Sequence, residues 1–393
     1  MNDSSFLEKV KDRYPQIVFE GPSDLDICST DFSVVSGQCD AVIIPTELRQ
    51  VSEVVKLANE VEILLTVRGG GTSMTGASVP TTGIVLDLSA FDFIKLTGSS
   101  VEVGSGVILS ELNDCLALSD RFFPVTPASL MAATIGGMYS TNAIGMRGMR
   151  YGRMSDWVRE IEFVDGTGKT RVIDDDDEIK RLSGKEGTFG IVTRLILDTI
   201  KINKDISYDI LEFDSIVELI SKISELQDDK NVAMLEFMCP ICCEYSKISP
   251  SNYRLIIEYS DYSRGSVKAI EKGKVWKSRV GLGSVLTAAG FMLLDDPYVT
   301  KIDQKENLLN WFRKHKIPVF GHIGYGIFHP RFRTDQEDLL REMLDFVVKI
   351  GGNVTGEHGY GTAKSEYMPE DVRAEFIKIK KKYDPDGVFR SIG

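Results

Sequence analysis

Short apolar runs and amphipathic segments alternate along the first half of the chain. Runs over 41–44, 63–67, 84–88 and 161–164 are rich in β-branched residues, which predicts buried strands. Over 48–58 the apolar residues recur at helical spacing, so a helix is predicted between the first two strands. This order is typical of a parallel α/β unit, in which ligands bind where the strands end. We therefore expect a binding segment directly after residue 67.

The second half of the chain, from about residue 204, shows a different set of elements. The pattern predicts strands over 207–213, 232–238, 254–259 and 317–323, and helices over 215–226, 263–277 and 334–350. Strands and helices in this arrangement fit a separate α+β domain with an antiparallel sheet.

A glycine-rich loop follows the strand that ends at Val67. Gly69, Gly70 and Gly71 leave the backbone free to turn tightly and to point its N–H groups at an anion such as phosphate. Arg68 adds a fork of donors, and the residues that follow add hydroxyls. The spacing matches neither a Rossmann nor a P-loop motif. A plain glycine turn is the alternative interpretation of this loop taken alone.

Two further segments are rich in glycine and other small residues. Over 124–152 small residues dominate, and charges are few. A disordered linker would be more polar, whereas a backbone that lies against a large flat ligand needs such residues. A second glycine cluster follows over 184–193.

Composition and charge narrow the class of protein. The net charge of −12 argues against a nucleic-acid partner and against an anionic membrane surface. The N-terminus lacks the basic and apolar regions of a signal peptide, and no apolar run could span a bilayer. Cys239, Cys242 and Cys243 lack a second pair at zinc or iron–sulfur spacing, so we interpret them as buried free thiols. We expect a cytoplasmic protein, with peripheral attachment at the inner face of a membrane as an alternative.

Three of the four histidines fall in two glycine-flanked motifs, over 321–330 and 355–361. His322 and His329 are seven residues apart, so a flat strand would point them to opposite faces. Gly324 and Gly326 would allow a bulge that brings both inward. Two histidines with one carboxylate form an open metal site. Packed structural histidines are the alternative.

The glycine-rich elements occur in a characteristic order over about 41–200. They read RGGGTS, PVTPAS, TIGG, NAIG, YG and KEGTFGIVT. Together they resemble the FAD-binding domain of the vanillyl-alcohol oxidase and p-cresol methylhydroxylase superfamily. Within it, the chain is most similar to the FAD-linked D-2-hydroxyacid dehydrogenases, the D-lactate dehydrogenase and glycolate oxidase group. The implied fold class is α+β: a p-cresol methylhydroxylase-type FAD-binding domain (1–203), an α+β cap domain that binds substrate (204–350), and a C-terminal segment returning to the FAD domain (351–393).

The resemblance also implies site residues. Those implied for FAD are Arg68, Gly69, Gly70, Gly71, Thr72, Ser73, Pro127, Ala128, Ser129, Thr134, Gly136, Gly137, Asn142, Glu186, Gly187, Ile191 and Val192. No histidine precedes residue 315, so noncovalent FAD is expected. The implied ligands of a divalent metal, commonly zinc in the family, are His322, His329 and Glu357. His358 is the implied catalytic base, and Arg279 is the implied partner of the substrate carboxylate.

The activity implied is oxidation of a D-2-hydroxy acid of the D-lactate or glycolate class to the 2-oxo acid. Hydride would pass from C2 to flavin N5 while the metal and a histidine assist. A quinone, a cytochrome, an electron-transfer flavoprotein and oxygen all stay open as the electron acceptor, and a homo-oligomer is compatible with the sequence. Two alternatives are a noncatalytic FAD-binding subunit of a multisubunit oxidase and a flavin-free metal-dependent hydrolase or oxygenase.

Several positions depart from the family pattern. Tyr325 and Ile327 stand where relatives usually have aspartate and asparagine, and no lysine lies near 293–296, where relatives that bind dicarboxylates usually carry one. These departures favour a small or apolar-tailed hydroxy acid over a substrate with a second carboxylate.

Overall fold

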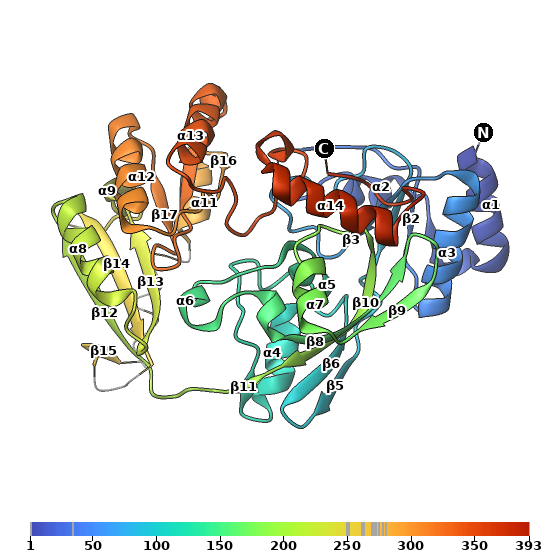
Figure 1. Cartoon of the computed structure of the whole chain (residues 1–393), viewed down its shortest axis with the longest axis horizontal. Coiled ribbons are helices and arrows are strands. Elements are labelled where there is room, and N and C mark those ends of the chain that lie inside the picture. The colour runs from blue at the N-terminus through green and yellow to red at the C-terminus, as the bar shows by residue number, and fades with distance from the viewer. Residues whose placement is uncertain are drawn as a thin grey trace.

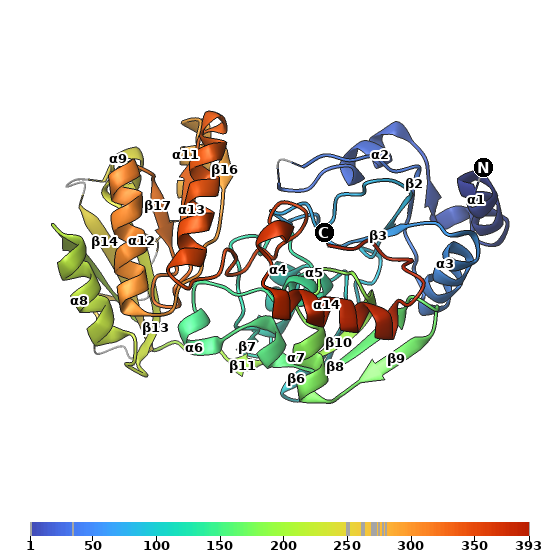
Figure 2. The same cartoon turned by 45° about the horizontal axis from the view of Figure 1, so that its top comes forward.

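The computed structural model describes residues 2–392 except 34, 249–251, 261–263, 269–272, 274–275, 277–278 and 280. Figure 1 shows two lobes joined by the segment between β11 and β12, with both termini in the same lobe. Figure 2 shows the same separation after a 45° turn. None of the described helices is long and apolar enough to cross a membrane.

The first lobe begins with the predicted parallel unit. Its four-stranded sheet has the order β1-β2-β4-β3, with β1 (Val18–Phe19), β2 (Ala41–Ile43), β3 (Leu65–Arg68) and β4 (Ile84–Asp87). Strands β2 and β3 both pair in parallel with β4, and β1 is antiparallel. The helix between β2 and β3 is α3 (Leu48–Val61), which confirms the strand–helix–strand prediction. The glycine loop therefore leaves the carboxyl end of β3.

A five-stranded antiparallel sheet completes this lobe, in the order β5-β6-β10-β8-β9. Its strands are β5 (Ile94–Thr97), β6 (Ser100–Gly104), β8 (Val158–Asp165), β9 (Thr170–Ile173) and β10 (Gly190–Asp198). A small pair, β7 (Arg121–Phe122) and β11 (Ile200–Lys201), lies beside it. The helices of the lobe are α1 (Asn2–Arg13), α2 (Pro22–Cys28), α4 (Leu109–Ala117), α5 (Ile135–Thr141), α6 (Gly148–Tyr151), α7 (Asp176–Leu182) and α14 (Glu370–Tyr383).

The second lobe contains a seven-stranded sheet in the order β15-β12-β14-β13-β17-β18-β16. Its strands are β12 (Ser207–Phe213), β13 (Val232–Met238), β14 (Tyr253–Tyr259), β15 (Val267–Lys268), β16 (Leu293–Leu294), β17 (Val319–Gly321) and β18 (His329–Phe332). Every pair in it is antiparallel, which confirms the predicted sheet. Its helices are α8 (Ile216–Leu226), α9 (Pro240–Tyr245), α11 (Leu282–Ala288), α12 (Ile302–His315) and α13 (Glu337–Lys349).

One predicted helix of the second lobe is wrong at its start. The helix expected over 263–277 includes β15, which instead pairs with β12 at the edge of the sheet. Most of the remaining residues of that prediction lie outside the described part of the chain.

The lobes are linked by buried polar contacts and by the end of the chain. The guanidinium of Arg147, just before α6, donates two hydrogen bonds of 2.5 and 2.9 Å to the carboxylate of Glu258 on β14. A carboxylate this deeply buried is stable only with such a partner. After α13 the chain returns to the first lobe, where Leu65 N–H donates to Val388 O, and α14 lies beside α7 (Figure 1).

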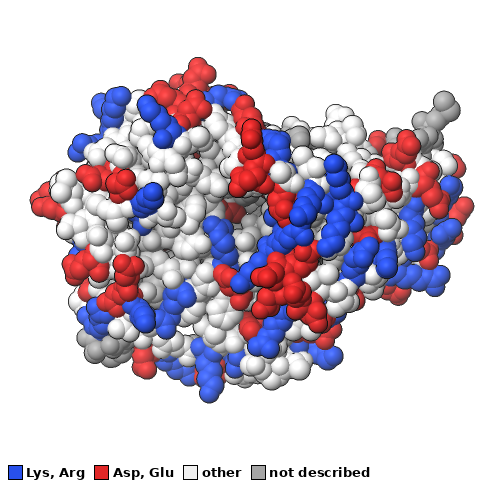
Figure 3. Space-filling view, in the orientation of Figure 1, with Lys and Arg blue, Asp and Glu red and all other residues white. Residues whose placement is uncertain are grey.

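The outer surface carries both signs of charge. Figure 3 shows acidic and basic side chains interspersed over the face seen in Figure 1. Because charges of both signs are mixed on this face, we expect an anionic substrate to be recognised by charges inside the site.

Candidate active site

The two histidines of the first motif lie on a β-hairpin, and not on one bulged strand as predicted. Strand β17 ends at Gly321, the chain turns, and β18 begins at His329. Phe320 pairs with His329 across the hairpin, which places His322 one step beyond that pair. Gly326 has φ of +104°, a left-handed conformation that the turn requires. The turn therefore brings the imidazoles together, with Nε2 atoms 3.4 Å apart.

Glu357 completes a group of three donors from two distant segments. Its carboxylate lies 3.3 Å from Nε2 of His329 and 3.9 Å from Nε2 of His322. A tetrahedral zinc with ligands at about 2.0–2.1 Å would separate its ligand atoms by about 3.4 Å. Burial lowers the pKa of His329 well below its ordinary value, so this imidazole is neutral and able to bind a cation. The donor set thus fits the expected divalent metal.

A second layer of charged side chains orients His322. Its Nδ1 contacts the carboxylate of Glu236 on β13, leaving Nε2 to face Glu357. This is the usual outer partner of a metal-binding histidine. Glu236 was not predicted from the sequence, although it is the one charged residue in the apolar strand VAMLEFM. A lone carboxylate in a fully buried strand is the signal that could have identified it.

The same Glu236 also holds Arg279. Both Nε and Nη2 of Arg279 lie 2.8 Å from Oε2 of Glu236, and the guanidinium stacks 4.4 Å above the Phe320 ring. Arg279 and His322 therefore share one carboxylate, which neutralises the charge of the arginine. Its contact with a substrate carboxylate stays a prediction.

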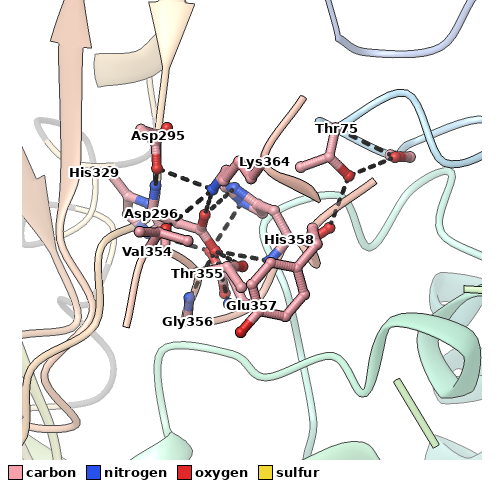
Figure 4. A network of polar contacts seen from close by, with 12 residues as sticks. Thr75, Asp295, Asp296, His329, Val354, Thr355, Gly356, Glu357, His358 and Lys364 are labelled. Carbon is pink, nitrogen blue, oxygen red and sulfur yellow. Dashed lines mark hydrogen bonds and ion pairs between the residues drawn. The ribbon is translucent and has the colours of Figure 1, made fainter. Parts of the chain in front are cut away.

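Asp296 organises the second histidine motif (Figure 4). Its Oδ2 accepts hydrogen bonds from the Thr355 hydroxyl and from three successive N–H groups, those of Gly356, Glu357 and His358, at 2.7–3.0 Å. Its Oδ1 pairs with the buried ammonium of Lys364. Such a carboxylate stays ionised because it accepts so many hydrogen bonds. Neither Asp296 nor Lys364 was predicted, since their partners are about 60 residues away in sequence.

The imidazole of His358 lies between two carboxylates. Nε2 is 3.2 Å from Oε1 of Glu357, and Nδ1 is 3.5 Å from Oδ1 of Asp296. Burial opposes a charge on this ring, but the two carboxylates outweigh it and raise the pKa of His358 to about 10. In the protein without a cation, the two carboxylates therefore favour the charged imidazolium. A cation held by Glu357 would repel the imidazolium and favour the neutral base.

The glycine loop presents its backbone to an anion. Gly71 has φ of +63°, and a Cβ there would lie 2.2 Å from Nη2 of Arg68. Within the described residues, the N–H groups from Gly70 to Ser73 have no hydrogen-bond acceptor. Successive unpaired N–H groups around a left-handed glycine form an anion nest. The loop thus fits the pyrophosphate of FAD.

The guanidinium of Arg68 lies against Gly71 but is held by carbonyl oxygens of the N-terminal segment. It donates to the carbonyl oxygens of Thr30 at 2.8 Å and Ile27 at 3.1 Å. The side chain fixes the N-terminal segment against the loop, so direct contact with FAD stays a prediction that this geometry disfavours. The hydroxyl of Ser73 accepts hydrogen bonds from Thr75 N–H and Ala77 N–H, which shapes the end of the loop.

The segment with Pro127, Ala128 and Ser129 leads into a turn whose Ala132 lies against the glycine loop. The carbonyl oxygen of Ser129 accepts hydrogen bonds from two N–H groups three and four residues later, which makes a tight turn. A Cβ on Gly70 would lie 1.9 Å from Ala132 O. Only glycine therefore fits where the loop crosses this turn.

The TIGG segment packs against the same loop. Thr134 caps α5, and its hydroxyl accepts a hydrogen bond from Gly137 N–H at 3.2 Å. A Cβ on Gly69 would lie 2.3 Å from that hydroxyl. Gly136 N–H donates to Ser105 O, so this group is already satisfied within the protein.

Three other residues implied for FAD, Asn142, Ile191 and Val192, make contacts within the protein. Asn142 ends α5 in a left-handed conformation, and its amide oxygen accepts from Ser155 N–H. Ile191 and Val192 lie on β10 with buried side chains. These contacts leave their roles toward FAD as predictions.

Glu186 ties the second glycine cluster to the second histidine motif. Its carboxylate accepts hydrogen bonds from Tyr360 N–H at 2.8 Å and Gly361 N–H at 3.0 Å. Gly187, with φ of +73°, lets this segment pass close to β3. From the glycine loop, the hydroxyl of Thr75 donates to His358 O at 3.2 Å. The backbone cradle and the histidine cluster are therefore in direct contact.

The fold and site define a flavin-dependent oxidoreductase. Residues 39–174 match the family described as "FAD binding domain", and residues 299–390 match "FAD linked oxidases, C-terminal domain". The chain belongs to these FAD-linked oxidases with a p-cresol methylhydroxylase-type FAD-binding domain, the family of the FAD-dependent 2-hydroxyacid dehydrogenases and oxidases.

Curated relatives align with this chain over most of their length. D-lactate dehydrogenase of Archaeoglobus fulgidus is 25% identical, covering 88% of this chain and 89% of the relative. The glycolate oxidase subunit GlcD of Bacillus subtilis is 25% identical, with 89% and 87% covered. D-2-hydroxyglutarate–pyruvate transhydrogenase of Saccharomyces cerevisiae is 27% identical, with 90% and 86% covered. The three names agree on a 2-hydroxy acid and differ in the rest of the substrate.

Solved structures share the fold at low identity. A chitooligosaccharide oxidase superposes with a TM-score of 0.73 at 14% identity, covering all of this chain and 98% of the other. An alkyldihydroxyacetonephosphate synthase also gives 0.73, at 16% identity, with 98% and 85% covered. The predicted fold class is thereby confirmed.

Proposed function

We propose that this protein oxidises a D-2-hydroxy acid to the 2-oxo acid with noncovalent FAD and a divalent cation. Zinc is the cation that we propose first. D-lactate and glycolate are the simplest members of the substrate class. The observation that carries the proposal is the convergence of His322, His329 and Glu357 within 3.9 Å of one another, beside His358. Names of relatives support the same class.

FAD supplies a hydride acceptor at N5, and the cation supplies a Lewis acid for the hydroxyl and carboxylate of the substrate. His322, His329 and Glu357 would hold the cation. The glycine loop would hold the pyrophosphate with its free N–H groups. Glu186 and Thr75 keep the two parts in contact, which fixes the distance between flavin and substrate.

His358 would take the hydroxyl proton on Nε2. Asp296 holds the other ring nitrogen and the backbone of the same segment, so the imidazole cannot rotate away. A positioned base of this kind contributes about 10²–10⁴-fold to the rate. A noncatalytic FAD-binding subunit would have no need of this fully connected set of buried charges.

We also propose the domain division 1–203, 204–350 and 351–393, which follows the two lobes and the returning segment in Figure 1. A cytoplasmic location, with or without peripheral membrane attachment, and an acceptor such as a quinone, a cytochrome or an electron-transfer flavoprotein complete the proposal.

Anaerobic mixing of the purified protein with single 2-hydroxy acids tests this function. Absorbance of oxidised flavin should bleach with D-2-hydroxy acids and stay unchanged with the L-enantiomers. Acid precipitation should leave all FAD in the supernatant, because no covalent bond is expected. No bleaching by any 2-hydroxy acid in metal-loaded protein would contradict the proposal.

A further inference from the structure

Arg331 on β18 is a partly buried cation that the site described above does not use. Its Nε is buried without a hydrogen-bond partner, and it forms no ion pair with a carboxylate in the described part of the chain. A buried donor without a partner is costly and is seldom kept without a function.

The strand places Arg331 on the same face of the sheet as His329. Residues two apart on a strand point to the same side, with Cα atoms about 6.6 Å apart. Leu294 on the neighbouring strand β16 pairs with Arg331. A Cβ on Gly283 of α11 would lie 3.0 Å from Nη2 of Arg331, so the guanidinium reaches the start of this helix. The absence of a side chain at Gly283 leaves room beside it.

Charge balance distinguishes Arg331 from its neighbour Arg279. Arg279 is paired with Glu236 at 2.8 Å, so that pair is neutral. Cys242, which also lies near Arg331, donates its thiol hydrogen to Val319 O, and a thiol carries no charge. One positive charge therefore stays uncompensated on this side of the site. A divalent cation held by His322, His329 and Glu357 would add a second positive charge beside the same strand.

We propose that Arg331 receives a second anionic group of the substrate, so that the site selects a 2-hydroxy dicarboxylate. This proposal rests on the proposed function, because the first carboxylate and the hydroxyl are assigned to the cation. It reverses the expectation, drawn from the missing lysine near 293–296, of a small or apolar-tailed acid. The positive charge comes from β18 and enters the site beside Gly283 and Arg279.

Binding of acids that lack a hydroxyl tests the contact without turnover, in protein loaded with Zn²⁺, where the cation would hold the first carboxylate. Glutarate, a diacid without a hydroxyl, should raise the melting temperature of the parent protein more than butyrate does at equal concentration. In Arg331→Leu the advantage of glutarate should vanish, and affinity for it should fall about tenfold to hundredfold. Arg331→Lys should restore part of it. Equal responses to both acids in the parent would overturn the proposal.

The matched control is Arg333→Leu, two residues further along, where the side chain is exposed and stacks on Phe291. It should leave the preference for diacids unchanged. Arg331→Leu should not lower the melting temperature of ligand-free protein, because it removes a buried Nε that has no partner. A marked drop would mean that Arg331 is structural, and would overturn the assignment.

Flavin reduction separates this proposal from the proposed function. The parent should reduce its flavin with a higher kcat/KM for D-malate or D-2-hydroxyglutarate than for D-lactate, and Arg331→Leu should lose that excess while keeping activity on D-lactate. Higher activity on D-lactate than on both diacids in the parent would overturn the role of Arg331 only. No reduction by any acid would overturn the proposed function itself.

Discussion

The glycine loop over 69–73 with the segments packed on it (the FAD cradle) and the cluster around His322, His329 and Glu357 (the cap site) are built from different chemical groups. The cradle consists of backbone N–H groups and glycines at positions where a Cβ would collide, such as Gly70 and Gly71. The cap site consists of buried charged side chains that hold one another, such as Glu236 with Arg279 and Asp296 with Lys364. A backbone site depends on local chain shape, whereas a side-chain site depends on partners brought together by the fold. Mutations should therefore separate cofactor retention from chemistry.

The largest separation is expected from removing a proposed metal ligand. His329→Ala removes one of three donors, so metal content and flavin reduction should fall together, the latter by about 10³-fold or more. FAD content should be unchanged, because the glycine loop is in the other lobe. Elemental analysis and anaerobic stopped-flow absorbance measure the two quantities.

His315→Ala is the control for that variant. His315 lies at the end of α12, stacked on Trp311, and belongs to neither motif. It should keep metal, FAD and rate. Full metal occupancy in His329→Ala would remove His329 from the ligand set.

Removal of the proposed base should spare both cofactors. His358→Asn keeps a polar side chain that cannot accept a proton near neutral pH, so flavin reduction should slow by about 10²–10⁴-fold. Metal and FAD should be retained. A reduction rate within a few-fold of the parent across the pH range would assign the base to another residue.

Removing the charge of Asp296 should slow flavin reduction indirectly, because Asp296 holds His358 and its segment in position. Asp296→Asn leaves Lys364 and His358 with one buried carboxylate fewer, and the four hydrogen bonds to Oδ2 can be kept only in part. We expect flavin reduction to fall about tenfold to hundredfold and the melting temperature to drop. Asp92→Asn, at an exposed position, is the control and should change neither.

A mutation in the FAD cradle should have the opposite effect: FAD should be lost while metal binding is kept. Gly71→Ala strains a left-handed residue and pushes a methyl group into Arg68, so FAD should be lost more readily while metal binding is kept. Gly98→Ala is the matched control, since Gly98 has φ of +62° and open space around its Cα. It should destabilise the protein to a similar small degree and keep FAD. Equal FAD loss in both variants would mean that strain alone is responsible.

The smallest effect concerns the contact between the two parts. Burial raises the pKa of Glu186 to about 7, despite the hydrogen bonds from Tyr360 N–H and Gly361 N–H. The folded state therefore binds more protons at this group than the unfolded state between about pH 4.5 and 7, and this group makes stability fall as pH rises through that range. Glu186→Gln should remove this slope, which amounts to a few degrees in melting temperature. An unchanged slope would exclude Glu186 as its source.

Sequence patterns predicted the cradle better than the cap site. The repeat of apolar residues and the spacing of glycines are properties of short stretches of sequence. For this reason β2, α3, β3 and the loop after Arg68 were predicted correctly. The histidine motifs were identified for the same reason. The hairpin that joins His322 to His329 was mistaken for a bulged strand, because period alone cannot distinguish a tight turn with two glycines from an irregular strand.

The remaining residues of the cap site depend on long-range contacts. Glu236 and Lys364 occur singly in apolar or mixed segments, Asp296 follows Asp295, and the partners of all three are distant in sequence. Arg68 and Arg279 show the converse, because each seemed available for a ligand until the fold supplied carbonyl or carboxylate partners. A charge in a sequence has no assigned partner until the chain is folded.

Dependence of flavin reduction on the cation tests the central claim most directly. The FAD-loaded protein is treated with a chelator, desalted and mixed anaerobically with a D-2-hydroxy acid, with and without added Zn²⁺ or Mn²⁺. The account predicts that FAD stays bound throughout and that its absorbance bleaches only when the cation is restored. Bleaching at the same rate in protein shown by elemental analysis to be free of metal would contradict it.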